Sequence, residues 1–178
     1  MPSLVARAAA QDPRAFAEIY DRYVHAIYRY CLFQVRRQAD AEDLTEQVFL
    51  RAWQAIGRFR PGERPFSAWL YRIARNAIVD HLRAANRQVE LAADVEAPAR
   101  AVEPGSIVEQ AATIAELRAA LRQLPAEHRQ IVLLRFVEGM SHDEVATVVG
   151  KSSGAVRVIQ HRALKRLRQI LERMGHRD

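Results

Sequence analysis

The stretch SHDEVATVVGKSSGAVRVIQHRALK, residues 141–165, has the spacing of a helix-turn-helix. Ser141 and Glu144 form a capping box, so a short helix is predicted to begin there. Two helices that cross at a tight turn need a glycine at the turn, a small residue where they touch, and branched apolar residues that lock the second helix onto the first. The residues in those places are Ala146, Gly150, Val156 and Ile159. An ordinary helical hairpin could use the same residues, so the spacing alone leaves both folds open.

The charge of the second helix favours DNA binding. Between Lys151 and Arg173 the chain carries seven lysines and arginines and a single acid, Glu172. At helical spacing the apolar residues take the inner face and leave a basic outer face. With Ser153 at the start of the helix, the candidate contacts are Ser153, Arg157, Val158, His161, Arg162, Lys165 and Arg168. A helix that enters the major groove needs such a face, because basic side chains pair with phosphates while a few others reach base edges.

A second helix, within RPFSAWLYRIARNAIVDHLRAANR (residues 64–87), has one more face than a core helix needs. Apolar residues at helical spacing supply a stripe for the core. Six other residues step by three or four and share a separate face: Trp69, Arg72, Asn76, Asp80, Arg83 and Arg87. An aromatic ring flanked by arginines and an amide can hold unpaired bases, at ~1 to 3 kcal/mol per stacked base. Two plainer interpretations stay open: the charged face is solvated, or Trp69 belongs to the core at the domain edge.

The composition favours a polyanionic partner. The chain has 178 residues, 49% of them hydrophobic, with a formal net charge of +6 and a pI near 10.1. That length allows one large domain or two small ones. Arginine far outnumbers lysine, and guanidinium pairs with phosphate in a planar two-bonded geometry. Nucleic acid is therefore the favoured partner, and an acidic membrane surface comes second.

Several other classes of function have no support in the sequence. Cys31 is the only cysteine and falls on the apolar side of a predicted helix, so we expect a buried thiol without a redox role. The N-terminus lacks the apolar core of a signal peptide, and no run of apolar residues approaches the length of a membrane span, which favours the cytoplasm. The six histidines show no metal-site spacing, and Asp80-His81 lacks a nucleophile or second carboxylate. We expect no metal, no cofactor, no membrane contact and no enzymatic activity.

Only helices are predicted along the chain, so the expected fold class is all-α. The expected helices cover residues 13–35 with Asp12 as the cap, 40–56 with Asp40 as the cap, 65–87, a segment from a Ser106/Glu109 capping box to Gln123, 126–137 and 142–150. A last helix, capped by Ser152 or Ser153, is expected to reach Met174. From Gln88 to Ala112 the periodicity is lost among prolines, a glycine and five acids against one base, which is typical of a flexible acidic linker. We predict two small helical domains, residues 1–87 and 106–178, joined by a linker over residues 88–105.

Three blocks of the sequence resemble, in order, the blocks of a known family. They are DAEDLTEQVFLRAW (residues 40–53), FSAWLYRIARNAIVDHLR (66–83) and LPAEHRQIVLLRFVEGMSHDEVATVVGKSSGAVRVIQHRALKRLR (124–168). They are similar to bacterial RNA polymerase sigma factors of the sigma-70 family, in the small extracytoplasmic-function (ECF) group that keeps only regions two and four. The resemblance implies that residues 1–87 form region two and residues 106–178 form region four with its helix-turn-helix.

The resemblance implies a polymerase-binding surface on the helix at residues 40–56. Its residues that match the docking helix of the family are Asp40, Asp43, Glu46, Gln47, Arg51 and Trp53. The family usually has glutamine before glutamate where this chain has Glu46-Gln47, so the contact of that pair stays open.

The resemblance also implies contacts to the promoter element at minus ten. Trp69, Arg72 and Asn76 match residues at the melted strand. The loop from Phe59 to Phe66 matches the one that captures a flipped base. This role would explain the extra face of the helix at residues 64–87.

At the minus-thirty-five element, Arg157 and Arg162 match the residues that read the duplex. The family often has Ser-Arg-Leu where this chain has Val158-Ile159-Gln160. Ile159 fits the core position expected from the spacing. Val158, on the outer face, can make only apolar contact, for instance with a thymine methyl group.

The function that the resemblance implies is promoter-specific initiation of transcription. The expected partners are core RNA polymerase, through the clamp of its β′ subunit and the flap of its β subunit, promoter DNA as duplex and as melted non-template strand, and an anti-sigma factor. The alternative is an autonomous helix-turn-helix regulator whose first domain dimerises or senses a ligand. Such a regulator binds duplex promoter alone, whereas a sigma factor needs core polymerase.

Overall fold

The structure is a computed structural model that describes residues 2–91 and 108–175, and within these ranges every regular element is a helix or helical turn. The N-terminal half holds α1 (Pro2–Ala9), α2 (Pro13–Gln34), α3 (Gln38–Ala55), the 3-10 turn η1 (Ile56–Arg58) and α4 (Phe66–Leu91). The C-terminal half holds α5 (Val108–Arg122), α6 (Ala126–Val132), the π-helical turn η2 (Leu133–Val137), α7 (His142–Val149) and α8 (Ser153–Gly175). The all-α prediction is confirmed. Most of the predicted linker, with Ser106 of its capping box, lies outside the described residues.

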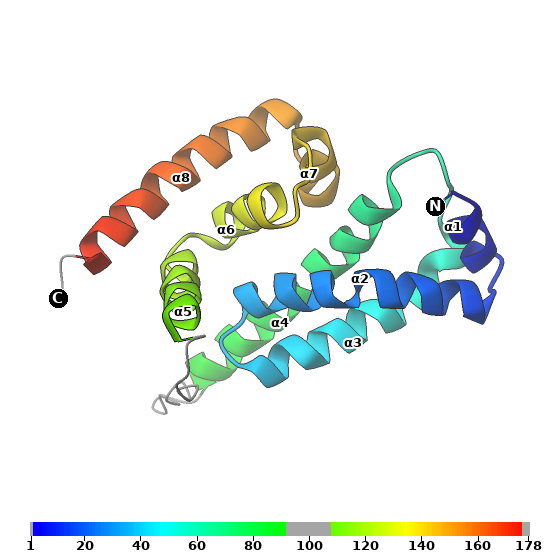
Figure 1. Ribbon diagram of the computed structural model, residues 1–178, viewed down its shortest axis with the longest axis horizontal. Helices are drawn as coiled ribbons and strands as arrows, with labels where there is room; N and C mark the ends of the chain where they lie inside the picture. Colours follow the sequence, from blue (N-terminus) through cyan, green and yellow to red (C-terminus); the bar gives the residue numbers. More distant parts are fainter. Residues whose placement is uncertain (1, 92–107, 176–178) are drawn as a thin grey trace.

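In the N-terminal half, α2, α3 and α4 lie side by side and α1 packs at one end (Figure 1). Asp12 caps α2 as predicted, because its carboxylate accepts hydrogen bonds from the backbone N–H groups of Arg14 and Ala15 at 2.9 and 3.3 Å. Fully buried aliphatic side chains from the three long helices fill the centre: Ile19, Ile27, Leu44, Leu70 and Ile78. This core fixes which faces of α3 and α4 remain on the surface.

The start of α3 differs from the prediction that Asp40 caps it. The helix begins two residues earlier, at Gln38, with Arg37 as an extended N-cap. The carboxylate of Asp40 instead accepts a hydrogen bond from the Arg37 guanidinium at 2.6 Å, which lowers the pKa of Asp40. Asp40 thus stabilises the first turn through its charge rather than as a cap.

Two further features were not predicted. The first is α1, an eight-residue helix that buries Leu4, Val5 and Ala8. The second is the extension of α4 four residues past Arg87 to Leu91, into the segment assigned to the linker. Both are short additions in which periodicity gives little signal.

In the C-terminal half, α8 packs across α6 and α7, and α6 lies between α8 and α2 (Figure 1). The predicted helix at residues 126–137 is present as α6 followed by η2, where the backbone N–H of Glu138 donates to the carbonyl oxygen of Leu133 at 3.0 Å. Two of the three capping predictions in this half are confirmed: Ser141 and Glu144 form a capping box, and Ser152, one of the two serines predicted to cap the last helix, accepts a hydrogen bond from the backbone N–H of Ala155. None of the helices described is both long and apolar enough to cross a membrane.

Candidate nucleic-acid interface

The turn between α7 and α8 has the geometry that the sequence spacing predicted. Gly150 ends α7 in the left-handed region, at φ 71° and ψ 36°, where a side chain would be strained. The backbone N–H of Gly150 donates to the carbonyl oxygen of Ala146 at 2.9 Å and closes the helix. Val156 is fully buried and holds the start of α8 against the body. These contacts make the pair a helix-turn-helix rather than a loosely packed hairpin.

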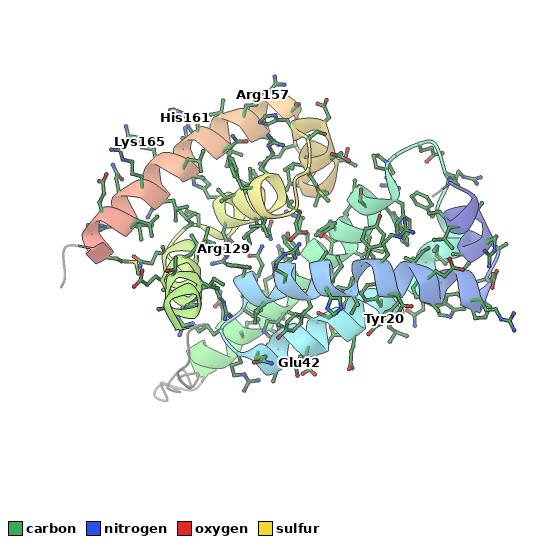
Figure 2. The ribbon with its side chains drawn as sticks, viewed as in Figure 1. Tyr20, Glu42, Arg129, Arg157, His161 and Lys165 are labelled. Carbon is green, nitrogen blue, oxygen red and sulfur yellow. The ribbon has the colours of Figure 1, made fainter. Side chains whose placement is uncertain are left out.

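The outer face of α8 is open to solvent. Val156, Ala163, Leu167 and Ile170 form its buried inner face. Six of the seven predicted DNA contacts are exposed: Arg157, Val158, His161, Arg162, Lys165 and Arg168. Arg157, His161 and Lys165 all point away from the rest of the molecule (Figure 2). The seventh, Ser153, is half-buried in the first turn of the helix.

A polar contact that no sequence pattern indicated fixes the register of α8. The amide oxygen of Gln160 accepts hydrogen bonds from Nε of Arg135 at 3.3 Å and lies 3.0 Å from Nε2 of His142. Gln160 thus joins α8 to η2 and to the first residue of α7. Ile159 beside it is half-buried, in agreement with its predicted core position, while Val158 is 50% exposed.

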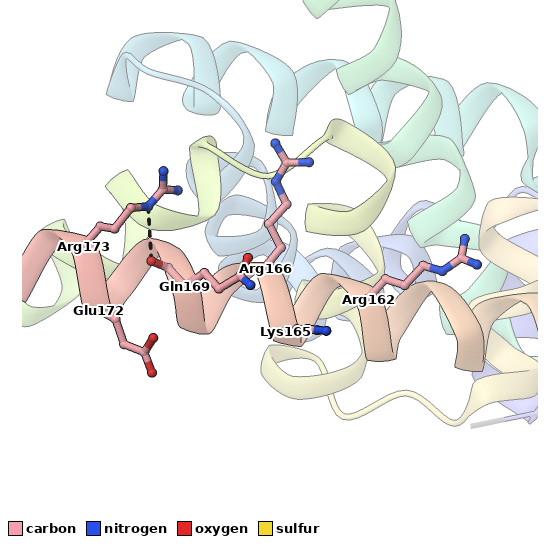
Figure 3. A pocket seen from close by; sticks show the side chains of 6 residues that line it. All are labelled: Arg162, Lys165, Arg166, Gln169, Glu172 and Arg173. Atoms are coloured by element: carbon pink, nitrogen blue, oxygen red, sulfur yellow. Dashed lines mark hydrogen bonds between the residues drawn. The ribbon is translucent and has the colours of Figure 1, made fainter.

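The C-terminal part of the same helix forms a shallow basic hollow of about 870 Å³. Four of its six lining side chains are basic (Figure 3): Arg162, Lys165, Arg166, Gln169, Glu172 and Arg173. The hollow extends the positive charge of the outer face as far as Arg173. An open surface of this kind suits a phosphate backbone rather than a small ligand.

On α4, the predicted second face is present except for its aromatic member. Arg72, Asn76, Asp80, Arg83 and Arg87 are exposed. Trp69 is only 9% exposed. The α4 surface is therefore polar and charged, without the exposed ring that the spacing suggested.

Trp69 lies in an aromatic cluster with Phe59 and Phe66, whose ring centroids are 5.2 and 5.3 Å from its own. Phe59 and Phe66 are also buried. The cluster closes the loop between η1 and α4 from both ends. In this structure Trp69 is a core residue at the domain edge, which was one of the two plainer interpretations of the sequence. The rings of Phe59, Phe66 and Trp69 are all buried.

Some side chains of the predicted docking surface on α3 are exposed, and others contact neighbouring side chains of the same half. Asp43, Glu46 and Gln47 are exposed. Trp53 is half-buried against the ring of Phe16, with centroids 5.0 Å apart.

Two other members of this surface form ion pairs. Asp40 pairs with Arg37, and Arg51 pairs with Asp80 of α4 at 3.3 Å. Since Arg51 belongs to the docking surface and Asp80 to the α4 face, this pair joins the two surfaces directly.

Comparison with known proteins identifies both halves. The model of sigma-70 region 2 matches residues 19–88, which include α3 and most of α4. The model of sigma-70 region 4 matches residues 120–169, which include the helix-turn-helix. The matched segments therefore contain the α3 and α4 surfaces and the outer face of α8, while Glu172 and Arg173 of the basic hollow lie beyond residue 169.

Curated relatives that align with nearly the whole chain are also sigma factors. The ECF RNA polymerase sigma factor BldN of Streptomyces coelicolor is 39% identical over 173 residues, which are 96% of this chain and 66% of that protein. This chain thus spans about two thirds of the length of BldN. The ECF RNA polymerase sigma factor SigD of Mycobacterium tuberculosis is 35% identical over 181 residues, covering 98% of this chain and 85% of SigD.

Among solved structures, the sigma factor RpoE of Bartonella quintana, in complex with the anti-sigma factor NepR, is similar over 88% of this chain and 96% of that chain. The two share 26% sequence identity with a TM-score of 0.74. The similarity extends to the arrangement of the helices and not only to the sequence blocks.

Proposed function

The chain belongs to the ECF group of the sigma-70 family of RNA polymerase sigma factors, and on that premise we propose that it binds core polymerase and directs it to promoters. In this proposal α8 reads the minus-thirty-five element as duplex, and α4 binds the minus-ten element once its strands separate. The chain supplies binding and strand separation without covalent chemistry.

The observation that carries the proposal is the outer face of α8. Its exposed side chains combine arginines and one lysine, which can pair with phosphates, with His161 and Val158, which can contact base edges. The helix-turn-helix and the Gln160 contacts hold this face in a fixed orientation, which sequence readout requires.

The α4 face supports the second part of the proposal. Arg72 can pair with a phosphate or stack on a base, and Asn76 can both donate to and accept from the edge of an unpaired base. Both side chains are exposed, one turn apart, at the surface next to the aromatic cluster. These interactions become available only when bases leave the duplex.

The partners and the domain limits are part of the same proposal. We infer that the exposed acids of α3 meet the clamp of the β′ subunit, that the C-terminal half meets the flap of the β subunit, and that the chain acts in the cytoplasm. An anti-sigma factor is proposed as a further partner because the structurally similar RpoE was solved with NepR. The division into functional domains at residues 1–87 and 106–178 remains a proposal.

Two assays on the same complex test the role of α4. With polymerase holoenzyme on a cognate promoter, permanganate footprinting reports unpaired thymines and gel shift reports binding of closed duplex. We expect Arg72→Ala and Asn76→Ala to reduce the footprint more than the shift, and Arg14→Ala, an exposed arginine of α2, to change neither. A parallel fall in both signals would assign the α4 face to duplex binding, as in an autonomous regulator.

A further inference from the structure

One apolar side chain lies in the middle of the basic outer face of α8. Val158 is 50% exposed. Residues three or four positions away on a helix are neighbours on its surface, and for Val158 none of these four residues is buried. His161 and Arg162 lie on its C-terminal side, and Gly154 and Ala155 lie on its N-terminal side. The packing of the core therefore does not require an apolar residue at this position.

Two other apolar residues of α8 are partly exposed, and the core explains both. Leu164 and Leu171 are 37% and 39% exposed, and each lies within one turn of the buried Leu167. They extend the edge of the inner face, where partial exposure is usual. Val158 differs from both because it lies among basic and polar side chains, away from the inner face.

The surface on the N-terminal side of Val158 is open. Helical side chains lean toward the N-terminus, so the side chain of Val158 lies over Gly154, four residues earlier. A Cβ atom added to Gly154 would have no neighbouring heavy atom within 4 Å, so packing among the described residues does not require glycine there. Glycine does allow another molecule to approach the backbone closely. We call Val158 together with Gly154 the apolar spot of α8.

The apolar spot is held in place by contacts on both sides of it in the sequence. Val156 is fully buried, and the side-chain oxygen of Gln160 lies within hydrogen-bond distance of Arg135 and His142. Valine is branched at Cβ, so Val158 has one strongly preferred rotamer in a helix. An apolar group that is fixed in this way loses little conformational entropy when it contacts a partner.

The major groove of DNA offers one kind of apolar group to such a spot. Adenine, guanine and cytosine present hydrogen-bonding groups there, whereas thymine also presents the methyl group on its C5 atom. Cytosine that is methylated on C5 carries the same group at the same place. The side chain of Val158 has no donor or acceptor, and a polar base edge pressed against it would lose water without gaining a partner. The apolar spot therefore favours a pyrimidine with a C5 methyl group.

We propose that Val158 contacts the C5 methyl group of a pyrimidine in the minus-thirty-five element, with Gly154 leaving room for the base. Arg157 and His161, which point away from the molecule on either side of Val158 in the sequence (Figure 2), then contact the neighbouring phosphates or base edges. The inference rests on the proposed function, because it requires that α8 bind duplex DNA, and it adds the chemical group that α8 recognises. At one base pair the chain distinguishes thymine from uracil, and 5-methylcytosine from cytosine.

Single methyl groups of the promoter provide the test. Each thymine in the minus-thirty-five element of a cognate promoter is replaced in turn by uracil, which removes the methyl group and keeps every hydrogen-bonding group. Gel shift measures the affinity of polymerase holoenzyme for the closed duplex. We expect one of these replacements to weaken binding about fourfold, the effect of one buried methyl group. At the same position, 5-methylcytosine should bind about fourfold more tightly than cytosine.

Two variants of the apolar spot should abolish both differences. Val158→Ser removes the apolar contact, and Gly154→Leu places a bulky side chain where the base would approach. Leucine is a good helix former and the space around Gly154 is open, so Gly154→Leu should keep its circular dichroism. Leu164→Ser is the matched control, because it removes an exposed apolar side chain from the edge of the same helix. It should keep the full difference between thymine and uracil.

The outcomes separate this inference from the proposed function. Promoter binding by the unmodified holoenzyme that is equally tight with thymine and with uracil at every position would overturn the methyl contact and leave the proposed function intact. A difference between thymine and uracil that persists unchanged in Val158→Ser would overturn it as well. Absence of promoter-specific binding by holoenzyme with the unmodified chain would instead reject the proposed function, and the methyl contact with it.

Discussion

The position of Trp69 on α4 is compatible with two roles, stacking on an unpaired base or packing in the core. Its ring packs between Phe59 and Phe66, so we predict that Trp69→Ala lowers the free energy of unfolding by ~3 to 5 kcal/mol, the usual range for a buried aromatic. Arg72→Ala, on the exposed face, should stay within about 0.5 kcal/mol. Urea denaturation measures both. An unchanged free energy of unfolding for Trp69→Ala, together with a lost permanganate footprint, would show that the ring binds DNA rather than stabilising the core.

Cys31 is a buried thiol, and the effect of its burial can be tested by measuring stability as a function of pH. Burial raises the pKa of its thiol from 9.0 to about 12, so the folded chain keeps a proton that the unfolded chain loses above pH 9.0. Stability should therefore fall as pH rises from 9.0 toward 12, by up to about 1.4 kcal/mol per pH unit. Denaturation of the unmodified chain and Cys31→Ala at about pH 8, 9 and 10 checks this. Equal slopes in the two proteins would contradict it.

At the level of single residues, the sequence predicted positions better than partners. The buried Cys31 and the exposed Arg157 follow from helical periodicity, which assigns faces. The contacts of Gln160 and Glu138 could not be predicted. A polar side chain at the edge of a helix face gives the same sequence pattern whether it is solvated or hydrogen-bonded to a distant helix. Only the three-dimensional structure shows that Arg135 donates to Gln160 and that Arg29 and Tyr71 donate to Glu138.

Helix α3 combines an apolar face for the core with acids that folding does not use. We predict that Asp43→Lys with Glu46→Lys weakens binding to core polymerase by about tenfold or more, because like charges would then face each other at a complementary surface. Glu18→Lys with Asp21→Lys, the same charge change on exposed sites of α2, is the matched control. Co-purification and circular dichroism measure assembly and folding. Intact folding with undiminished assembly would show that α3 is not the docking surface.

Helix α8 should contain two kinds of DNA contact. Arg157, near its start, is placed to reach base edges, where a good bidentate contact discriminates by ~1 to 3 kcal/mol, so Arg157→Ala should relax specificity. Lys165→Ala should weaken binding to every sequence alike and reduce the salt dependence by about one phosphate contact. Binding to a panel of minus-thirty-five sequences at several salt concentrations separates them. Equal sequence profiles for the two variants would remove the distinction.

The helices themselves could be predicted where caps and periodicity agreed. Asp12 before Pro13, and Ser141 with Glu144, marked helix starts that the structure confirms. The start of α3 was misplaced because an acid near a helix N-terminus can act either as a cap or through its charge in the first turn. The π-helical turn η2 was not predicted, because a change in the hydrogen-bond register of a helix leaves its pattern of apolar residues almost unchanged.

For the whole molecule, the sequence indicated two helical units but not their contact. The halves meet through Arg29, Arg75 and Arg129, and isolated arginines in a basic chain suggest solvent or DNA rather than an internal interface. Helical periodicity indicates which apolar residues face a core, whereas the contacts named here are polar. The contact between the two halves is therefore seen only in the three-dimensional structure.

The central proposal is that this chain acts through core RNA polymerase. Run-off transcription on a cognate promoter, with purified core polymerase and the chain added separately and together, tests that claim directly, with gel shift of the chain alone on the same duplex. We predict a transcript from the promoter start only when both proteins are present, and little binding of the duplex by the chain alone. Tight binding of the duplex by the chain alone, with no promoter-specific transcript when core polymerase is added, would contradict the account and establish an autonomous regulator.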